Sequence, residues 1–300
     1  MRDKAQLTEL AGEFERSRGH LRAVAFRMLG SADDAEDAVQ EAWLRASGAD
    51  IGNVVNMTGW LTTIVGRICL DMLRARGRRG EELTDMAGFE LAAADSDAAG
   101  PDDQAIMADS VGLALMVILD RLGPAERVAF VLHDLFAVPF DEIAGIVDRS
   151  PAAAKKLASR ARHRVHGTAT VPAADLTRQR QVVDAFLAAS RAGDLGALLA
   201  VLAPEVVRRA DRAVLPAGVP AELRGVRRVA EAALTNAGLA RFARPALVNG
   251  VIGMVVAPRG RLLRVLEVTI DGDRITAIDV IGEPARLRRL DLAAVDIASA

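Results

Sequence analysis

Hydrophobic residues recur with helical spacing over the first quarter of the chain. Two consecutive segments follow the i, i+3, i+4, i+7, i+8 pattern: Leu21, Val24, Ala25, Met28 and Leu29, then Ala35, Ala38, Val39, Ala42 and Trp43. Gly30 and Ser31 separate them, and Ser31 is the expected N-cap of the second helix. A third helix is expected from Thr58, with its inward residues at Leu61, Ile64, Ile68 and either Met72 or Leu73. The pattern predicts an all-α helical bundle over residues 1–79.

The helical pattern stops after residue 79 and returns near residue 108. Residues 80–107 are rich in Ala, Asp, Glu and Gly without a sustained period, which predicts a flexible acidic linker. A second all-α domain is expected over 108–168. Its helices are predicted at 108–121, 125–135, 140–147 and 151–165, with Pro124 and Pro139 at the breaks.

Residues 169–300 combine helical and strand-like patterns. Helices are expected near 178–202 and 225–238, followed by strands at 246–256, 262–270 and 274–281. Asp271, Gly272 and Asp273 form a hairpin signal between the last two strands. Helices followed by a meander predict a separate α+β domain.

Composition narrows the location and chemistry of the chain. No apolar run approaches the length of a membrane span, and the first residues lack the apolar stretch of a secretory signal, so we expect a cytoplasmic protein without membrane contact. The single cysteine, Cys69, excludes an intramolecular disulfide and is expected in the core. The net charge is only −2, but the charges are segregated: residues 33–41 hold five acids and no base, whereas residues 67–79 hold five bases and one acid. Such segregation indicates separate surfaces for separate partners.

Residues 140–164 have the pattern of a helix-turn-helix. Asp148 and Arg149 are expected to turn the chain, Ser150 to cap the second helix, and Pro151 to occupy its first position. Five polar residues are then left on its outward face: Lys155, Lys156, Ser159, Arg160 and His163. A helix-turn-helix places such a face in the major groove of DNA. The alternative is an ordinary solvated basic face.

An acidic stripe marks one side of the second predicted helix. Asp33, Asp37 and Glu41 are spaced by four residues, with Gln40 beside them. Like charges at this spacing destabilise a helix, which favours a partner-binding surface. A merely solvated helix face is the competing interpretation.

The third predicted helix and the loop before it are candidates for DNA contact. Arg67, Arg74 and Arg78 fall on a common face that could contact a DNA backbone, while Trp60 is expected in the core. Asn53 and Asn56 in the loop could read the edge of a base that has left the stack. Ordinary turn chemistry would also explain the two asparagines.

The segments DAEDAVQEAW at 34–43 and WLTTIVGR at 60–67, with the helix-turn-helix at 140–164, closely resemble the extracytoplasmic-function sigma factors of bacterial RNA polymerase. The resemblance covers residues of roughly 10 to 168. It implies that region 2 docks on the β′ clamp helices through Asp37, Gln40 and Glu41, with the β subunit as a further contact. It also implies that the 50–58 loop and the arginine-rich helix open and read the −10 promoter element. The 150–164 helix is expected to read the −35 element through its polar residues: Ser150, Lys155, Lys156, Ser159, Arg160 and His163.

Residues 169–300 resemble the SnoaL-like domain that some of these sigma factors carry. The resemblance implies that this domain modulates sigma activity in cis and that no separate anti-sigma factor is needed. We therefore expect core RNA polymerase and promoter DNA as partners, and no cofactor, metal or catalytic residue.

Two alternatives stay open. Fold relatives of the SnoaL-like domain include cyclases and isomerases, and Asp211 or Asp279 could supply a catalytic carboxylate, although the chain has no tyrosine and no histidine beyond His166. The chain could also be a helix-turn-helix regulator fused to a ligand-binding domain, but the acidic stripe and the arginine-rich helix would then have no role.

Overall fold

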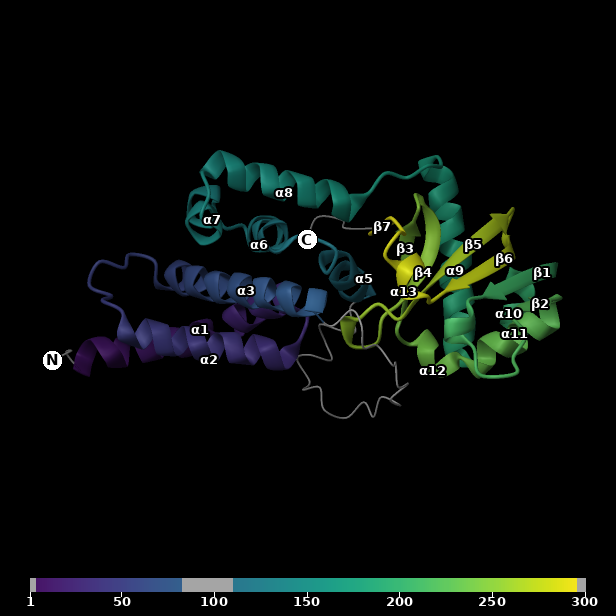
Figure 1. The fold of residues 1–300 in the computed structure, drawn as a ribbon, viewed down its shortest axis with the longest axis horizontal. Helices are drawn as coiled ribbons and strands as arrows, with labels where there is room; N and C mark the ends of the chain where they lie inside the picture. Colours follow the sequence, from purple (N-terminus) through teal and green to yellow (C-terminus); the bar gives the residue numbers. More distant parts are fainter. Residues whose placement is uncertain (1–3, 83–109, 296–300) are drawn as a thin grey trace. The chain divides into compact units, whose positions relative to one another are not determined.

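The computed structural model describes residues 4–82 and 110–295 (Figure 1). These residues pack as two compact units. The first contains the described residues up to 82 together with 119–162, and the second contains 110–118 together with 163–295. Most of the predicted acidic linker lies outside the described residues.

The first three helices agree with the sequence pattern. They are α1 (Lys4–Leu29), α2 (Ala32–Gly48) and α3 (Met57–Glu82). Ser31 caps α2, because its Oγ accepts a hydrogen bond from the backbone N–H of Asp34 at 3.3 Å, as predicted. The observed helix α1 starts at Lys4 and is therefore longer than predicted, because the apolar pattern was recognised only from Leu21.

Helix α3 is buried on more than one side. Leu61 and Ile68 are buried as predicted, whereas the other expected inward residues are only half-buried: Ile64, Met72 and Leu73. Val65, Cys69 and Leu70 are also buried. The extra burial arises because α3 packs against α1 and α2 and also against α6 (Pro124–Phe130) and α7 (Phe140–Val147). Cys69 is the expected core residue, and burial raises the pKa of its thiol to about 12.

The second set of helices lies close to its predicted positions. It comprises α5 (Ser110–Leu119), α6, the π-helical segment η1 (Val131–Leu135), α7 and α8 (Pro151–His166). Pro124 occupies the first turn of α6, and Pro139 is the residue before α7. The sequence thus placed the breaks correctly, but the π-helical geometry after Phe130 was not expected.

The second unit contains one mixed sheet. In the described residues it has seven strands in the order β2-β1-β6-β5-β4-β3-β7. Their bounds are β1 (Leu202–Ala210), β2 (Glu222–Arg224), β3 (Ala243–Val248), β4 (Val251–Val256), β5 (Arg264–Asp271), β6 (Arg274–Ile281) and β7 (Leu292–Ala293). β1 runs parallel to β6, and the other pairs are antiparallel. The predicted α+β class is therefore correct.

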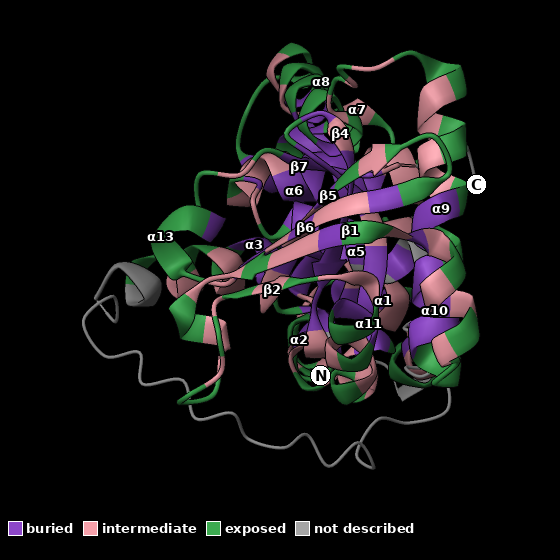
Figure 2. Cartoon of the chain, turned by 90° about the vertical axis from the view of Figure 1, so that its right-hand side faces the viewer, coloured by how far each residue is buried: buried purple, intermediate pink, exposed green. Residues whose placement is uncertain are grey.

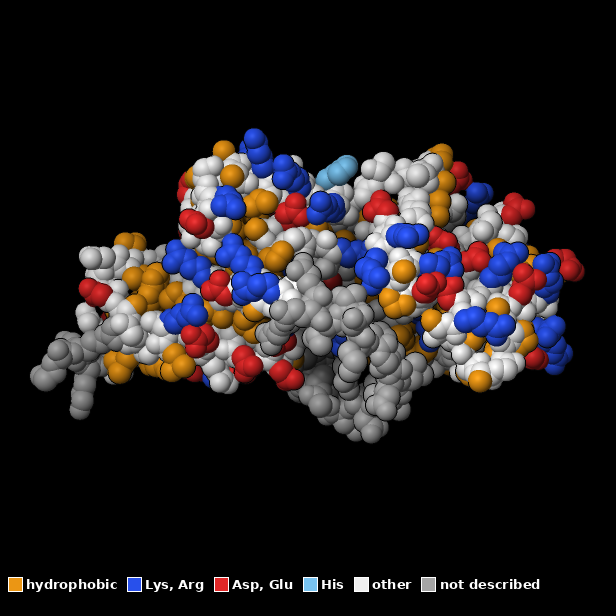
Figure 3. Space-filling model, in the orientation of Figure 1, with side chains coloured by type: hydrophobic (Ala, Val, Ile, Leu, Met, Phe, Trp, Pro, Cys, Tyr) orange, Lys and Arg blue, Asp and Glu red, His pale blue; other side chains and the backbone are white. Residues whose placement is uncertain are grey.

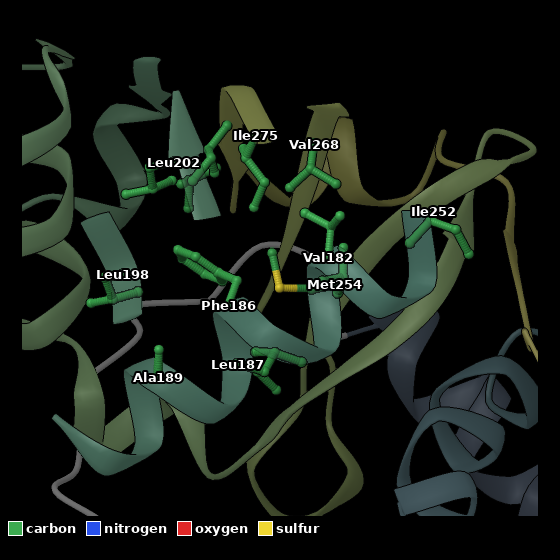
Figure 4. Packing of buried hydrophobic residues seen from close by; sticks show 14 of the residues in the cluster. Val182, Phe186, Leu187, Ala189, Leu198, Leu202, Ile252, Met254, Val268 and Ile275 are labelled. Atoms are coloured by element: carbon green, nitrogen blue, oxygen red, sulfur yellow. The ribbon is translucent and has the colours of Figure 1, made fainter. Parts of the chain in front are cut away.

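Helices cover one face of this sheet. They are α9 (Ala173–Ala192), α10 (Leu195–Val201), α11 (Val226–Thr235) and α12 (Ala237–Ala240). The short helix α13 (Pro284–Leu287) follows β6, and the 3-10 turns η2 (Arg212–Val214) and η3 (Pro258–Gly260) lie in loops. Figure 2 shows that α9 and α10 each carry both buried and exposed residues. In the core, Phe186 of α9 lies next to Met254 of β4 (Figure 4).

Two predictions for this domain were wrong in detail. The expected helix at 178–202 is broken after α9, because Gly193 adopts φ 69° and Asp194 caps α10 by accepting from the N–H of Ala197. The expected strand at 246–256 is a hairpin of β3 and β4. Its turn residues Asn249 and Gly250 have φ 52° and 82°, the left-handed geometry that an Asn-Gly pair favours.

Among the helices of the described residues, none is long and apolar enough to cross a bilayer.

Candidate nucleic-acid and protein interfaces

The second helix of the predicted helix-turn-helix presents a polar face to solvent. Helix α8 buries Ala154, Ala158, Ala161 and Val165. The residues expected on its outward face are all exposed: Lys155, Lys156, Ser159, Arg160 and His163. Figure 3 shows Lys and Arg side chains gathered along α8. The exposed face therefore carries positive charge and hydrogen-bond donors on a straight helix, which is what a DNA groove accepts.

The turn before α8 has the expected chemistry. Asp148 ends α7 in the left-handed conformation, with φ 54°, and the N–H groups of Asp148 and Arg149 both reach the carbonyl of Ala144. Ser150 accepts from the N–H of Ala153 at 3.2 Å and so caps α8. Ser150 is exposed, but its oxygen is already engaged in this cap.

The predicted protein-binding residues border one shallow hollow. Asp37, Gln40 and Glu41 of α2 line it together with residues of α2 and α3: Leu44, Arg45, Ile68, Asp71 and Met72. The hollow measures about 420 Å³. Leu44 is 64% exposed, so an apolar side chain stands among charged neighbours, an arrangement typical of the centre of a protein interface. Glu41 accepts from Arg45 Nε at 2.9 Å, which partly neutralises its charge.

The loop between α2 and α3 holds its two asparagines differently. Asn53 is exposed, whereas the side-chain oxygen of Asn56 accepts from the N–H of Gly59 at 3.0 Å and caps α3. Asn56 thus performs turn chemistry, which the sequence left open. The apolar Val55 beside it is fully exposed at 102%, and the sequence pattern did not single it out.

The arginines of α3 do not share one environment. Arg78 and Arg74 are exposed, and Arg74 lies 3.9 Å from Asp71. Arg76 instead binds the carbonyl of Leu29 and the carboxylate of Asp34, which ties α3 to the first two helices.

Arg67 points at the helix-turn-helix. Its Nη2 donates to the carbonyl oxygen of Gly145 at 3.0 Å. One residue earlier, Gly66 is buried, and a Cβ at this position would lie 3.2 Å from Cδ1 of Ile146. The absence of a side chain at position 66 therefore lets α3 and α7 approach closely. Sequence reasoning missed this contact, because nothing local marks it.

A buried arginine lies in the same helical unit. Arg127 of α6 is 3% exposed and pairs with Asp120, while its Nε and Nη2 have no hydrogen-bond partner among the described residues. Burial lowers the pKa of Arg127 despite the attraction of Asp120, and the charge of Arg76 lowers it further. The unit thus contains a buried charge whose hydrogen-bonding groups are only partly satisfied.

The carboxylates suggested for catalysis in the third domain have structural partners. Asp211 is 12% exposed and binds the N–H groups of Gly282 and Glu283 and the side chain of Arg286. Burial opposes ionisation of Asp211, but these three donors together lower its pKa. Asp279 faces Arg209 at 3.8 Å. Neither lines the cavity of this domain. Within the described residues, no group of His, Cys, Asp or Glu side chains could hold a metal ion.

Comparison with known proteins places both helical domains in one family. The model of Sigma-70 region 2 matches residues 14–79, and the model of Sigma-70 region 4 matches residues 112–165. The chain is 38% identical to the ECF RNA polymerase sigma factor SigJ of Mycobacterium tuberculosis H37Rv, over 91% of each chain. It is 34% identical to the probable ECF sigma factor SigI of the same species, over 90% of this chain and 92% of SigI. The crystal structure of SigJ aligns over 92% of this chain and 98% of its own, with 36% identity and a TM-score of 0.46. The chain belongs to the extracytoplasmic-function family of RNA polymerase sigma factors.

Proposed function

We propose that this sigma factor binds core RNA polymerase and directs it to promoters in the cytoplasm through three surfaces. The α2 face with Asp37, Gln40 and Glu41 docks on the β′ clamp helices. The 50–58 loop, with Asn53 and Asn56, and the α3 arginines Arg67, Arg74 and Arg78 open and read the −10 element. Helix α8 reads the −35 element, and the region around it contacts the β subunit.

The observation that carries this proposal is the exposed face of α8. Five side chains that could contact DNA lie outward on a helix whose opposite face is packed through alanines. In a helix-turn-helix, such an exposed face on the second helix is the part that enters the major groove of DNA. The acidic hollow supports a second, protein-binding surface, because it combines carboxylates with the exposed Leu44.

In the helical unit, α3 packs against α7 of the helix-turn-helix, and we call this arrangement the closed state. In the closed state, part of the surface that we assign to the −10 element is occupied. Arg67, which we assign to the −10 element, is held by Gly145 of the helix-turn-helix. Binding of the −10 element through Arg67 therefore requires α3 and α7 to separate. If only a fraction of molecules is open, the apparent affinity for polymerase falls by that fraction.

We further propose that the SnoaL-like domain shifts this balance toward the closed, inactive state and has no enzymatic activity of its own. The alternative is activation, in which the same domain holds the linker in the conformation that polymerase binds and so raises activity. The domain limits 1–79, 80–107, 108–168 and 169–300, and the absence of a separate anti-sigma factor, stay predictions. So does the attraction that we propose between the basic DNA-contacting helices and the linker carboxylates, which lie outside the described residues: Asp95, Asp97, Asp102 and Asp103.

Run-off transcription with purified core polymerase tests this function. The full chain should support promoter-dependent transcription, and a chain ending at residue 168 should bind core more tightly at matched salt, with its helix content verified by circular dichroism. Neutralising the four linker aspartates should raise binding partially. Failure of the full chain to bind core would contradict the sigma function, whereas equal or weaker binding by the shortened chain would contradict only the inhibitory role.

A further inference from the structure

The SnoaL-like domain contains an apolar cavity between its helices and the sheet. It measures about 90 Å³, enough for several water-sized positions. Its wall is mostly aliphatic and aromatic, with Phe186 of α9, Val229 of α11, Leu239 of α12 and Met254 of β4 among the lining residues. Apolar concave sites with a few polar groups are the usual form of a small-molecule site.

Two arginines interrupt this apolar wall. Arg208 comes from β1 and Arg264 from β5, the strands on either side of β6. Arg208 is in register with Ile278 of β6, and Arg264 with Val256 of β4, and both partners also line the cavity. Because strand residues alternate between the two faces of a sheet, the two guanidinium groups share the cavity face.

Neither arginine is neutralised within the described residues. No carboxylate there forms an ion pair with Arg208 or Arg264, and the Nε of Arg264 is buried without a hydrogen-bond partner. Burial lowers the pKa of both groups, and the charge of Arg208 lowers the pKa of Arg264 further. Two half-buried like charges therefore stand close together beside an apolar wall, which is unfavourable without a counter-charge.

Three other arginines of the same domain have hydrogen-bond or ion-pair partners. Arg209, the neighbour of Arg208 on the opposite face of β1, pairs with Glu222 at 3.1 Å. Arg191 donates to the carbonyls of Ala240 and Ala243, and Arg286 pairs with Asp211. Arg208 and Arg264 differ from these three because they line a cavity and have no carboxylate partner among the described residues.

An anion with an apolar body would neutralise the two arginines and also pack against the apolar wall. A carboxylate accepts two parallel hydrogen bonds from a guanidinium fork, and two forks neutralise it without bulk water. The aliphatic wall favours an uncharged alkyl or ring body. We propose that this cavity binds a small organic acid, with its carboxylate at Arg208 and Arg264 and its apolar body against Phe186, Leu239 and Met254.

The remaining polar side chains favour binding over reaction. Ser190 donates to the carbonyl of Phe186, and Asn236 donates to the carbonyl of Ala232. The lining holds no carboxylate, imidazole or thiol that could accept or donate a proton. The acid is therefore a ligand that is held and released unchanged.

Isothermal titration of the full chain tests the site with hexanoate and benzoate as probes, and with hexanol and hexylammonium as matched compounds that lack the negative charge. We expect one mole of either acid to bind per chain, at least tenfold more tightly than hexanol, and no binding of hexylammonium. Arg208→Met and Arg264→Met should each weaken acid binding at least tenfold. Arg209→Met, with the same change on the other face of the strand, should bind as the wild type does.

Thermal melting without ligand separates this role from a structural one. Removing one of two unpaired like charges should leave the melting temperature unchanged or raise it, whereas loss of a structural arginine would lower it. Arg264→Lys, which keeps the charge but loses the fork, should bind with intermediate affinity. No binding of either acid, equal binding of hexanol, or full acid binding by the Arg208→Met and Arg264→Met variants would overturn the proposal.

Discussion

Arg67 Nη2 donates a hydrogen bond to the carbonyl oxygen of Gly145 at 3.0 Å, and this bond joins α3 to the first helix of the helix-turn-helix. Gly66 beside it gives Ile146 the room to pack. Arg67, which we assign to the −10 element, thus holds region 2 and region 4 together in the closed state.

Arg127→Met should favour the closed helical unit. Arg127 is buried with two nitrogens unpaired, while its partner Asp120 is half-exposed and stays solvated without it. Replacing a buried ion pair by apolar residues often stabilises a protein by about 1 to 4 kcal/mol, and here the partner that remains, Asp120, is not itself buried. We expect a higher melting temperature by circular dichroism and weaker binding to core polymerase. Arg149→Met, at an exposed position, is the control. A lower melting temperature for Arg127→Met alone would show that the arginine stabilises the unit.

Asp37→Lys combined with Glu41→Lys should abolish binding to core polymerase with little effect on helix content. Asp37 is exposed and Glu41 half-buried at the edge of the hollow, and surface substitutions usually change stability by about 0.5 kcal/mol or less. Asp271→Lys with Asp273→Lys makes the same change of charge on an exposed turn of the third domain. Polymerase pull-down should retain this control. If the α2 double variant is retained as well, the docking surface has been assigned wrongly.

Arg160→Ala should weaken recognition of the −35 element. A bidentate base contact is worth about 1 to 3 kcal/mol and is lost only at one promoter position, whereas a phosphate contact weakens all sequences alike. Arg162→Ala on the same helix is the matched control, because Arg162 pairs with Asp134 at 2.6 Å. A panel of promoter mutants in a binding assay distinguishes the two kinds of contact. Wild-type affinity throughout the panel would mean that another face of α8 meets DNA.

Asp211→Asn should destabilise the SnoaL-like domain near neutral pH. The ionised carboxylate is bound by three donors, and losing a charged hydrogen-bond acceptor costs about 1 to 3 kcal/mol. Because its pKa is lowered in the folded protein, the contribution is present above the unfolded pKa and is lost as pH falls through the folded value. The stability gap between wild type and variant should therefore narrow below about pH 4. Asp279→Asn, at a more exposed pair, should change little. A gap independent of pH would refute this linkage.

The features that depend only on neighbouring residues were predicted correctly from the sequence. Proline at the helix starts, the Ser31 and Ser150 caps and the outward face of α8 follow from neighbouring residues, and the structure confirms them. The Asn249-Gly250 turn was also readable, since this pair is a strong hairpin signal, but the apolar run across it was taken as one strand.

The rest depends on residues far apart in the chain. Strand β1 contains Pro204 and two arginines, and its parallel partner β6 lies more than sixty residues later, so its own pattern did not predict a strand. The contact of Arg67 with Gly145 and the meeting of Arg208 with Arg264 in one cavity likewise arise only from tertiary packing.

A reversible disulfide between α3 and α7 tests most directly whether the closed state must open for function. In the closed unit, a Cβ at position 66 would lie 3.4 Å from Cγ2 of Ile146, a position that a cysteine sulfur could take, so Gly66→Cys with Ile146→Cys should form a disulfide. The native Cys69 should not interfere, because it is buried and its pKa is raised to about 12. The two single variants serve as controls.

Run-off transcription by core polymerase with this double variant, oxidised and then reduced, is the decisive measurement. We expect that the oxidised protein gives no promoter-dependent transcript and that reduction restores it, while both single variants are active in either condition. A cross-linked protein that transcribes as well as its reduced form would contradict the claim that the two sigma domains must separate.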